Sequence, residues 1–167
     1  MKTSLIFSFI IATFFTIFSS SLFPYFKPVF YAPFLVLLFF NLRISSTLWL
    51  SCLSGLIVDL FSSTHLGLHA LISILCASFF YRQKRFFKET PINIAIFSSL
   101  ISFVYVLLNA ILLFVFEKGI KITPSWVMTD LIAMSFFDGL YALICFALPI
   151  KAFEMIKKRK LVEDDDE

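Results

Sequence analysis

The chain has 167 residues, of which 60% are hydrophobic and 15% are charged, and its mean hydropathy is +0.95. Ordinary globular domains carry about a quarter charged residues, so this composition excludes a disordered chain, a fibrous repeat and a soluble enzyme domain. The net charge of +3 comes from basic residues dispersed among apolar ones, which excludes a nucleic-acid-binding surface. We expect an all-α integral membrane protein, with one bundle of transmembrane helices over residues 1–156.

Six apolar runs are the candidate spans of this bundle, because about 20 helical residues cross a hydrocarbon core of about 30 Å. They are Thr3–Phe23, Val29–Leu42, Ile44–Phe61, His65–Tyr81, Ile92–Phe116 and Val127–Ile150. The first run lacks an A-x-A-like cleavage site, so we expect a retained span rather than a signal peptide. The second run is the shortest and contains Pro33, so five spans are the alternative to six. Arg43 alone separates the second run from the third, which predicts a tight helical hairpin.

Basic residues indicate the orientation. With six spans and a cytoplasmic N-terminus, all but three of the 14 lysines and arginines lie on the cytoplasmic side. The three exceptions are Lys27, Lys118 and Lys121. With five spans only Lys2 and Lys27 exchange sides, so the C-terminus is cytoplasmic in both arrangements.

Several residues are expected to anchor the bundle at the membrane interfaces. They are Trp126 on the outer side and Arg82, Lys84 and Arg85 on the inner side. Thr123 and Pro124 are typical of the N-cap and the first position of a helix, and so predict where the last helix begins. Residues 157–167 are basic and then acidic, which predicts a disordered cytoplasmic tail.

Small and polar residues recur at spacings of three or four on four of the predicted helices, which places them on one face of each helix. The stripes are Ser4, Ser8, Ala12 and Thr16; Thr47, Ser51, Gly55 and Asp59; His65, His69, Ser73 and Ala77; and Ser98, Ser102, Tyr105 and Asn109. Helices in lipid associate through close backbone approach and interhelical hydrogen bonds. The stripes therefore predict either a compact bundle with polar sides facing inward or an interface with a second membrane protein.

Asp59 is an acid inside an apolar run, near the outer end of its helix. His65 and His69 begin the next helix on the same side, so we expect a charged carboxylate–imidazole hydrogen bond that fixes the intervening turn. Proton or substrate binding and contact with a partner's helix are the alternatives. The His65–His69 spacing suits a metal pair, but the catalytic glutamate and a third ligand are lacking, so we expect no metal.

Two further acids lie in the last apolar run. Asp130 falls in the first turns of the helix, where the positive end of the helix dipole favours an acid. Asp138 falls near mid-membrane beside Gly139. We expect it to be protonated or bonded to a polar group such as Asn109 or Tyr105, and to line a cavity. Motifs of catalysis or nucleotide binding are absent from the sequence, so we expect neither an enzyme nor a cofactor.

The segment Gly55–Leu71, with the sequence GLIVDLFSSTHLGLHAL, resembles the central segment of the bacterial rod shape-determining protein MreD family. In that family a span with G-x-x-x-D-L ends in a short Ser/Gly-rich turn, and a Leu-Gly pair and another apolar helix follow. Here the matching residues are Gly55, Asp59, Leu60, Leu66 and Gly67. The resemblance extends to Tyr31-Ala32-Pro33, to the basic loop after Tyr81 and to the overall length. Ser63 in place of a common glycine and the acidic tail depart from the family pattern.

The resemblance implies a non-catalytic subunit of the machinery that synthesises peptidoglycan during cell elongation, located in the bacterial cytoplasmic (inner) membrane. The implied partners are an MreC-like single-span protein, the filament protein MreB and the glycosyltransferase–transpeptidase pair, with membrane lipid around them. The implied fold is a six-helix bundle similar to the substrate-binding subunits of energy-coupling-factor transporters. That likeness supplies the alternative function, a small-molecule transport subunit with Asp59, His69, Asn109 and Asp138 around an outward cavity. Under the first function, the candidate structural or docking residues are Gly55, Asp59, His65, Gly67, His69, Asn109 and Asp138.

Overall fold

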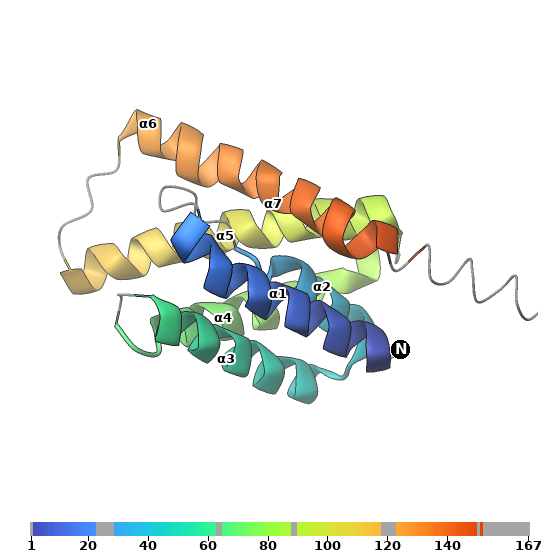
Figure 1. Cartoon of the computed structure of the whole chain (residues 1–167). Coiled ribbons are helices and arrows are strands. Elements are labelled where there is room, and N and C mark those ends of the chain that lie inside the picture. Colours follow the sequence, from blue (N-terminus) through green and yellow to red (C-terminus); the bar gives the residue numbers. More distant parts are fainter. Residues whose placement is uncertain are drawn as a thin grey trace, which may run out of the picture.

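The computed structural model describes residues 2–22, 29–62, 65–87, 90–117, 123–149 and 151. This part of the chain is all-α and contains no strand. The elements are α1 (Lys2–Leu22), α2 (Ala32–Asn41), α3 (Ile44–Phe61), α4 (Leu68–Tyr81), the 3₁₀ turn η1 (Gln83–Phe86), α5 (Pro91–Glu117) and a last helix over 124–149. Figure 1 shows these helices lying roughly along one axis, with successive long helices running in opposite directions. The predicted tail over 157–167 lies outside the described residues.

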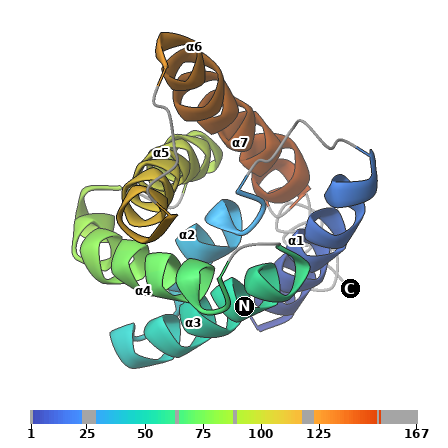
Figure 2. The ribbon, with the colours of Figure 1, turned by 90° about the vertical axis from the view of Figure 1, so that its left-hand side faces the viewer.

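Helix α2 lies in the middle of the bundle. Figure 2 shows it surrounded by α1, α3, α4, α5 and α7. Every residue over 31–39 is buried, which suits a helix that is apolar on all sides until Asn41. Ten residues make a helix of about 15 Å, half of a hydrocarbon core. The second apolar run therefore forms a central half-length helix.

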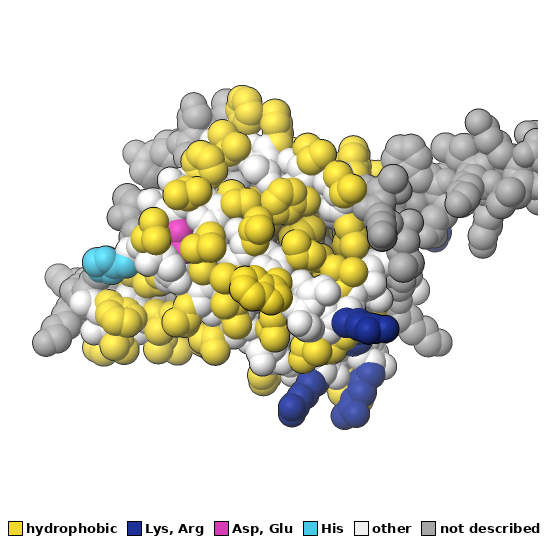
Figure 3. All heavy atoms as spheres, turned by 90° about the horizontal axis from the view of Figure 1, so that it is seen from below, with side chains coloured by type: hydrophobic (Ala, Val, Ile, Leu, Met, Phe, Trp, Pro, Cys, Tyr) yellow, Lys and Arg dark blue, Asp and Glu magenta, His cyan; other side chains and the backbone are white. Residues whose placement is uncertain are grey.

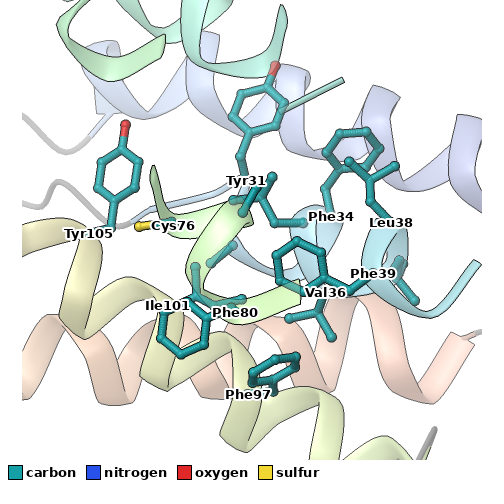
Figure 4. Close-up of a cluster of buried hydrophobic side chains, with 14 of the residues drawn as sticks. Tyr31, Phe34, Val36, Leu38, Phe39, Cys76, Phe80, Phe97, Ile101 and Tyr105 are labelled. Atoms are coloured by element: carbon teal, nitrogen blue, oxygen red, sulfur yellow. The ribbon is translucent and has the colours of Figure 1, made fainter. Parts of the chain in front are cut away.

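The core around α2 is largely aromatic. The ring of Phe97 on α5 lies 5.8 Å from that of Phe39 on α2, 5.6 Å from that of Phe80 on α4 and 4.6 Å from that of Phe87 (centroid distances). Figure 4 shows Phe39, Phe80 and Phe97 converging from their three helices. Such offset or edge-on ring contacts add to the packing of large side chains. This cluster joins α2, α4 and α5.

The last helix contains two π-helical segments. It consists of α6 (Pro124–Trp126), the π-helical η2 (Val127–Ala133), α7 (Met134–Ala142) and the π-helical η3 (Leu143–Ala147). The predicted start is confirmed, because the Thr123 hydroxyl accepts the N–H of Trp126 at 3.2 Å and Pro124 occupies the first turn. Of the four segments, α7 packs most extensively on α5. Gly139 permits this, since a Cβ there would meet the Ser99 hydroxyl.

The connections from α2 to α3 and from α3 to α4 are both short, but only the first was predicted correctly. The tight hairpin is confirmed, because α2 ends at Asn41 and α3 begins at Ile44. The predicted start of the fourth helix at His65 is wrong, because α4 begins at Leu68. The residue before α4, Gly67, has a φ of +95°. This left-handed conformation favours glycine and does not occur within an α-helix, so α4 cannot extend back to His65.

The outside of the bundle is apolar. Figure 3 shows hydrophobic side chains over most of one face, including those of α3 and α4, with lysine and arginine side chains gathered at one end. Large side chains such as Trp49 (75% exposed) and Leu60 (71% exposed) point outward. Three stretches, Ile44–Phe61, Pro91–Phe116 and Pro124–Ala147, are long and apolar enough to cross a membrane. This supports a membrane-associated protein.

Candidate functional site

Asp59 caps the start of helix α4. Its Oδ1 accepts the N–H of His69 at 2.9 Å, and its Oδ2 accepts those of Gly67 at 3.0 Å and Ala70 at 3.2 Å. The first N–H groups of a helix have no partner within the helix, and a carboxylate is their strongest acceptor. Asp59 is only 3% exposed, so little water competes for these bonds. One carboxylate thus fixes the end of α3 against the beginning of α4.

The two glycines of the same segment have separate tasks. Gly55 lies where α3 contacts the backbone of α4, and a Cβ there would come within 2.6 Å of the His69 carbonyl oxygen and 2.7 Å of the Ala70 nitrogen. Gly67 supplies the left-handed turn that aims its own N–H at Asp59. We refer to Gly55, Asp59, Gly67, His69 and Ala70 as the α3–α4 junction. The close approach of α3 to α4, the cap of α4 and the turn before it therefore all lie within sixteen residues of sequence.

The expected hydrogen bond between the Asp59 carboxylate and the His69 imidazole is wrong. The carboxylate binds backbone N–H groups, because the left-handed Gly67 turns three of them toward it. The His69 ring instead stacks on Tyr105 of α5, with a 3° angle between the planes, and its Nδ1 shares a hydrogen bond of 2.8 Å with the tyrosine hydroxyl. His65 is exposed and lies before α4. His69 thus links the junction to α5.

Asp138 occupies the centre of the molecule and is fully buried. Its Oδ2 accepts the hydroxyl of Ser102 on α5 and the N–H of Val29, just before α2, the latter at 3.0 Å. The expected bond to a polar group is present, but the partner is Ser102 and not one of the two examples, Asn109 and Tyr105. Tyr105 is engaged by His69, and the Oδ1 of Asn109 has no partner among the described residues. Ser102 lies closer because Gly139, beside Asp138, brings α7 against α5.

The small and polar stripes face the interior wherever their side chains are described, except at His65. Asn109 is half-buried, and the buried members are Ser8, Ala12, Thr16, Thr47, Ser51, Gly55, Asp59, His69, Ser73, Ala77, Ser98, Ser102 and Tyr105. Of the two predicted uses, the inward-facing bundle is the one that this arrangement supports.

At the opposite end of the bundle, Lys84 of η1 and Tyr81 of α4 bond carbonyl groups at the end of α2. The Lys84 ammonium donates to the Phe39 carbonyl at 2.8 Å and lies 4.0 Å from the centre of the Tyr81 ring. The Tyr81 hydroxyl donates to the Leu42 carbonyl at 3.1 Å. These carbonyls lie at the end of α2, where no helical N–H remains to bond them. Lys84 was expected only as a surface anchor, and no local signal in the sequence could have revealed this contact.

The remaining predicted anchors and acid are at the surface. Arg82 and Arg85 are exposed, and Trp126 is half-buried. Asp130 is half-buried in η2, and its carboxylate accepts the hydroxyl of the neighbouring Thr129 at 2.8 Å. None of these residues contacts the α3–α4 junction in the described part of the chain.

A groove of about 470 Å³ lies between α5 and the last helix. It opens to the outside and is lined by Ala95, Ile96, Ser99, Leu100, Phe103, Ile132, Ser135, Phe136, Gly139, Leu140 and Leu143. Asp138 was expected to line a cavity, but its side chain points to the other side of α7, toward α2. The groove is therefore apolar, and Asp59, His69 and Asn109 are also absent from its lining.

Metal binding finds no support in the described residues, which contain no group of three or more His, Cys, Asp or Glu side chains placed to hold an ion. Cys52, Cys76 and Cys145 are free thiols. Comparisons with models of protein families, with curated proteins and with solved structures found no match for this chain.

Proposed function

We propose that all six helices, including the half-length α2, lie within a bacterial inner membrane, with both chain ends in the cytoplasm. The alternating directions of the helices support this arrangement. So does the position of the basic side chains that the structure describes. Arg43, Arg82, Lys84, Arg85 and Lys151 all lie at the end where α1 begins and the last helix ends. The positive-inside rule assigns that end to the cytoplasm.

Within that membrane, we propose that the chain is a non-catalytic subunit of the cell-wall elongation machinery, as its resemblance to the MreD family implies. The observation that carries the proposal is the α3–α4 junction. Gly55, Asp59 and Gly67, which carry the resemblance, are the residues that join α3 to α4 in space. Gly55 allows the close helix contact, Asp59 caps α4 and Gly67 forms the turn. These structural roles account for the motif without a catalytic reaction.

The junction suits the docking of a partner. Since Asp59 and Gly55 face inward, the outward side chains around them are held at fixed positions near the outer end of the bundle. Leu60 and Leu66 are 71% and 76% exposed there. Apolar side chains held rigidly lose little entropy on binding. We propose that an MreC-like single-span protein docks on this pair of helices, and that MreB and the synthase pair are engaged through the same assembly.

The alternative function, a small-molecule transport subunit, has less support. It needs polar side chains around an open cavity. Asp138 is fully buried and bonded to Ser102 and Val29, and Asp59 is occupied by three backbone N–H groups. The groove between α5 and the last helix is lined by neither acid.

Co-purification tests the proposed function. The full chain is co-expressed with the MreC-like protein of the same organism and, separately, with an unrelated single-span protein, and both are extracted in mild detergent. The proposal predicts a stable complex with the MreC-like protein alone. A well-folded chain that retains neither protein would overturn the proposal, and a small molecule that raises its melting temperature would favour the transport alternative.

A further inference from the structure

Three exposed arginines lie at the end of α3 and α4 that we assign to the cytoplasm. Arg43 is the residue before α3, Arg82 is the residue after α4, and Arg85 lies in η1. All three side chains are exposed. The hydrogen bond from the Tyr81 hydroxyl to the Leu42 carbonyl joins the residues just before Arg43 and Arg82, so the end of α4 is tied to the connection between α2 and α3. We call Arg43, Arg82 and Arg85 the basic patch, and Figure 3 shows basic side chains gathered at this end.

Lys84 lies among these residues but has a different task. Its ammonium is turned back onto the Phe39 carbonyl and the Tyr81 ring. The Arg43 side chain, by contrast, makes no capping hydrogen bond to α3. The Asp59 and Asp130 side chains lie toward the other end of the bundle, and Asp138 lies inside it. The described part of this end is therefore strongly positive, and its guanidinium groups face outward.

The surroundings of the basic patch are apolar and aromatic. Phe86 is 73% exposed, and the Arg85 guanidinium lies 4.9 Å from the centre of its ring. Phe79, one turn before Arg82, is 59% exposed, and Trp49 on α3 is 75% exposed. Exposed aromatic rings beside arginines, at the end of an apolar surface, are typical of the level where lipid headgroups meet acyl chains. An acidic protein segment would match the charge but not the exposed rings.

We propose that the basic patch binds the phosphate of an anionic phospholipid, whose acyl chains lie along the outward faces of α3 and α4. A guanidinium group offers paired N–H donors that match two phosphate oxygens, which a lysine ammonium cannot do. The site orients this end of the bundle at the inner leaflet and ties the lipid to the two helices of the α3–α4 junction. The inference rests on the membrane arrangement proposed above and not on the partner.

The test measures lipid retention by the purified full chain in detergent. The wild type, the variant Arg43→Gln/Arg82→Gln and the charge-matched control Lys157→Gln/Lys158→Gln are each titrated with phosphatidylglycerol or with phosphatidylcholine. Native mass spectrometry counts the lipid molecules that remain bound. We expect the wild type and the control to retain phosphatidylglycerol, and neither to retain phosphatidylcholine. We expect the double arginine variant to bind phosphatidylglycerol about tenfold or more weakly, since each basic residue near an anionic surface contributes roughly fivefold.

Further variants test whether the arginines bind phosphate through paired N–H groups or by charge alone, and competitors test whether the ligand is a lipid. Arg43→Lys/Arg82→Lys keeps the charge and should lose a clear part of the affinity, whereas wild-type affinity would overturn the forked phosphate contact. Displacement of the lipid by inorganic phosphate or by a glutamate-rich peptide would overturn a lipid site. Equal losses in the control and in the double glutamine variant would also overturn it.

A folding check accompanies each titration. The helical content and melting temperature of every variant are measured, and Arg82→Gln/Arg85→Gln replaces the first variant if Arg43 proves necessary for folding. No protein partner enters these titrations, so failure to bind lipid and failure to bind the MreC-like protein are observed separately.

Discussion

The carboxylate of Asp138 accepts the backbone N–H of Val29 at 3.0 Å, although 109 positions separate the two residues in the chain. This bond fixes the entry to α2 in the middle of the bundle, as the bonds of Asp59 fix the entry to α4 near one end of it. Both acids therefore bind backbone N–H groups at the beginning of a helix. A buried N–H is costly without an acceptor, which explains why these two acids are present in an apolar interior.

Replacing Asp59 by asparagine should destabilise the protein. One amide oxygen cannot accept all three N–H groups, and the amide NH₂ would face donors. The asparagine oxygen keeps at most two of the three bonds, and a buried N–H left without an acceptor costs about 1–3 kcal/mol, so we expect a loss of about 2 kcal/mol. The melting temperature in detergent should fall by roughly 4–8 °C. Asp130→Asn is the matched control, because Asp130 bonds only the neighbouring Thr129 among the described residues, and its melting temperature should hardly change. Equal stability of both variants would contradict the capping role.

The two helix–helix contacts made through glycine should respond differently to alanine. At Gly55 the new Cβ meets the backbone of α4, which cannot move without separating the helices, so Gly55→Ala should cost about 1–3 kcal/mol. At Gly139 the Cβ meets chiefly the Ser99 hydroxyl, which a second substitution can remove. Thermal unfolding should therefore show that Ser99→Ala rescues Gly139→Ala. A Gly55→Ala variant of wild-type stability would contradict the close contact.

Asp138 should tolerate asparagine far better than leucine. The asparagine oxygen can still accept from Val29 and Ser102, whereas leucine leaves both donors buried without an acceptor, at a cost of about 1–3 kcal/mol each. Hydrogen exchange should also show faster exchange of the Val29 amide in Asp138→Leu. Unchanged exchange and stability in the leucine variant would show that the start of α2 does not depend on this acid.

Cysteine labelling should report both ends of the bundle. In a background with Cys52, Cys76 and Cys145 replaced by alanine, we expect Lys2→Cys and Arg85→Cys to react only with a permeant maleimide in intact spheroplasts. We expect Ser125→Cys, at the other end, to react with an impermeant one. Labelling of Lys2→Cys from outside, with the other two unchanged, would exclude six membrane-embedded helices and favour the five-span alternative.

The sequence predicted the helices and their buried faces better than the contacts between them. The stripe from Thr47 to Asp59 identifies an inward face, because polar side chains in lipid must turn toward one another. The role of Gly55 depends on the neighbouring helix α4, and the role of Gly67 depends on its own φ angle. The spacing of residues in the sequence predicts neither. The bonds of Asp138 to Val29 and of Lys84 to Phe39 join distant parts of the chain, and they become visible only once α2 lies in the centre.

The wrong partners predicted for Asp59 have a physical explanation. Pairing an acid with nearby histidines assumes that the next helix begins at His65 and that side chains meet side chains. The left-handed Gly67 breaks this assumption, because it turns the backbone itself toward the carboxylate. A glycine a few residues after a buried acid, at a helix start, is the signal that could have indicated a cap.

Partner retention by Asp59→Asn, compared with Asp130→Asn at equal amounts of folded protein, tests the central claim most directly. The measurement is the amount of MreC-like protein that co-purifies per folded chain, below the melting temperature of either variant. The account predicts that Asp130→Asn retains the partner like the wild type, and that Asp59→Asn loses most of it because the α3–α4 junction no longer holds its outward side chains in place. Full retention by folded Asp59→Asn would contradict the account.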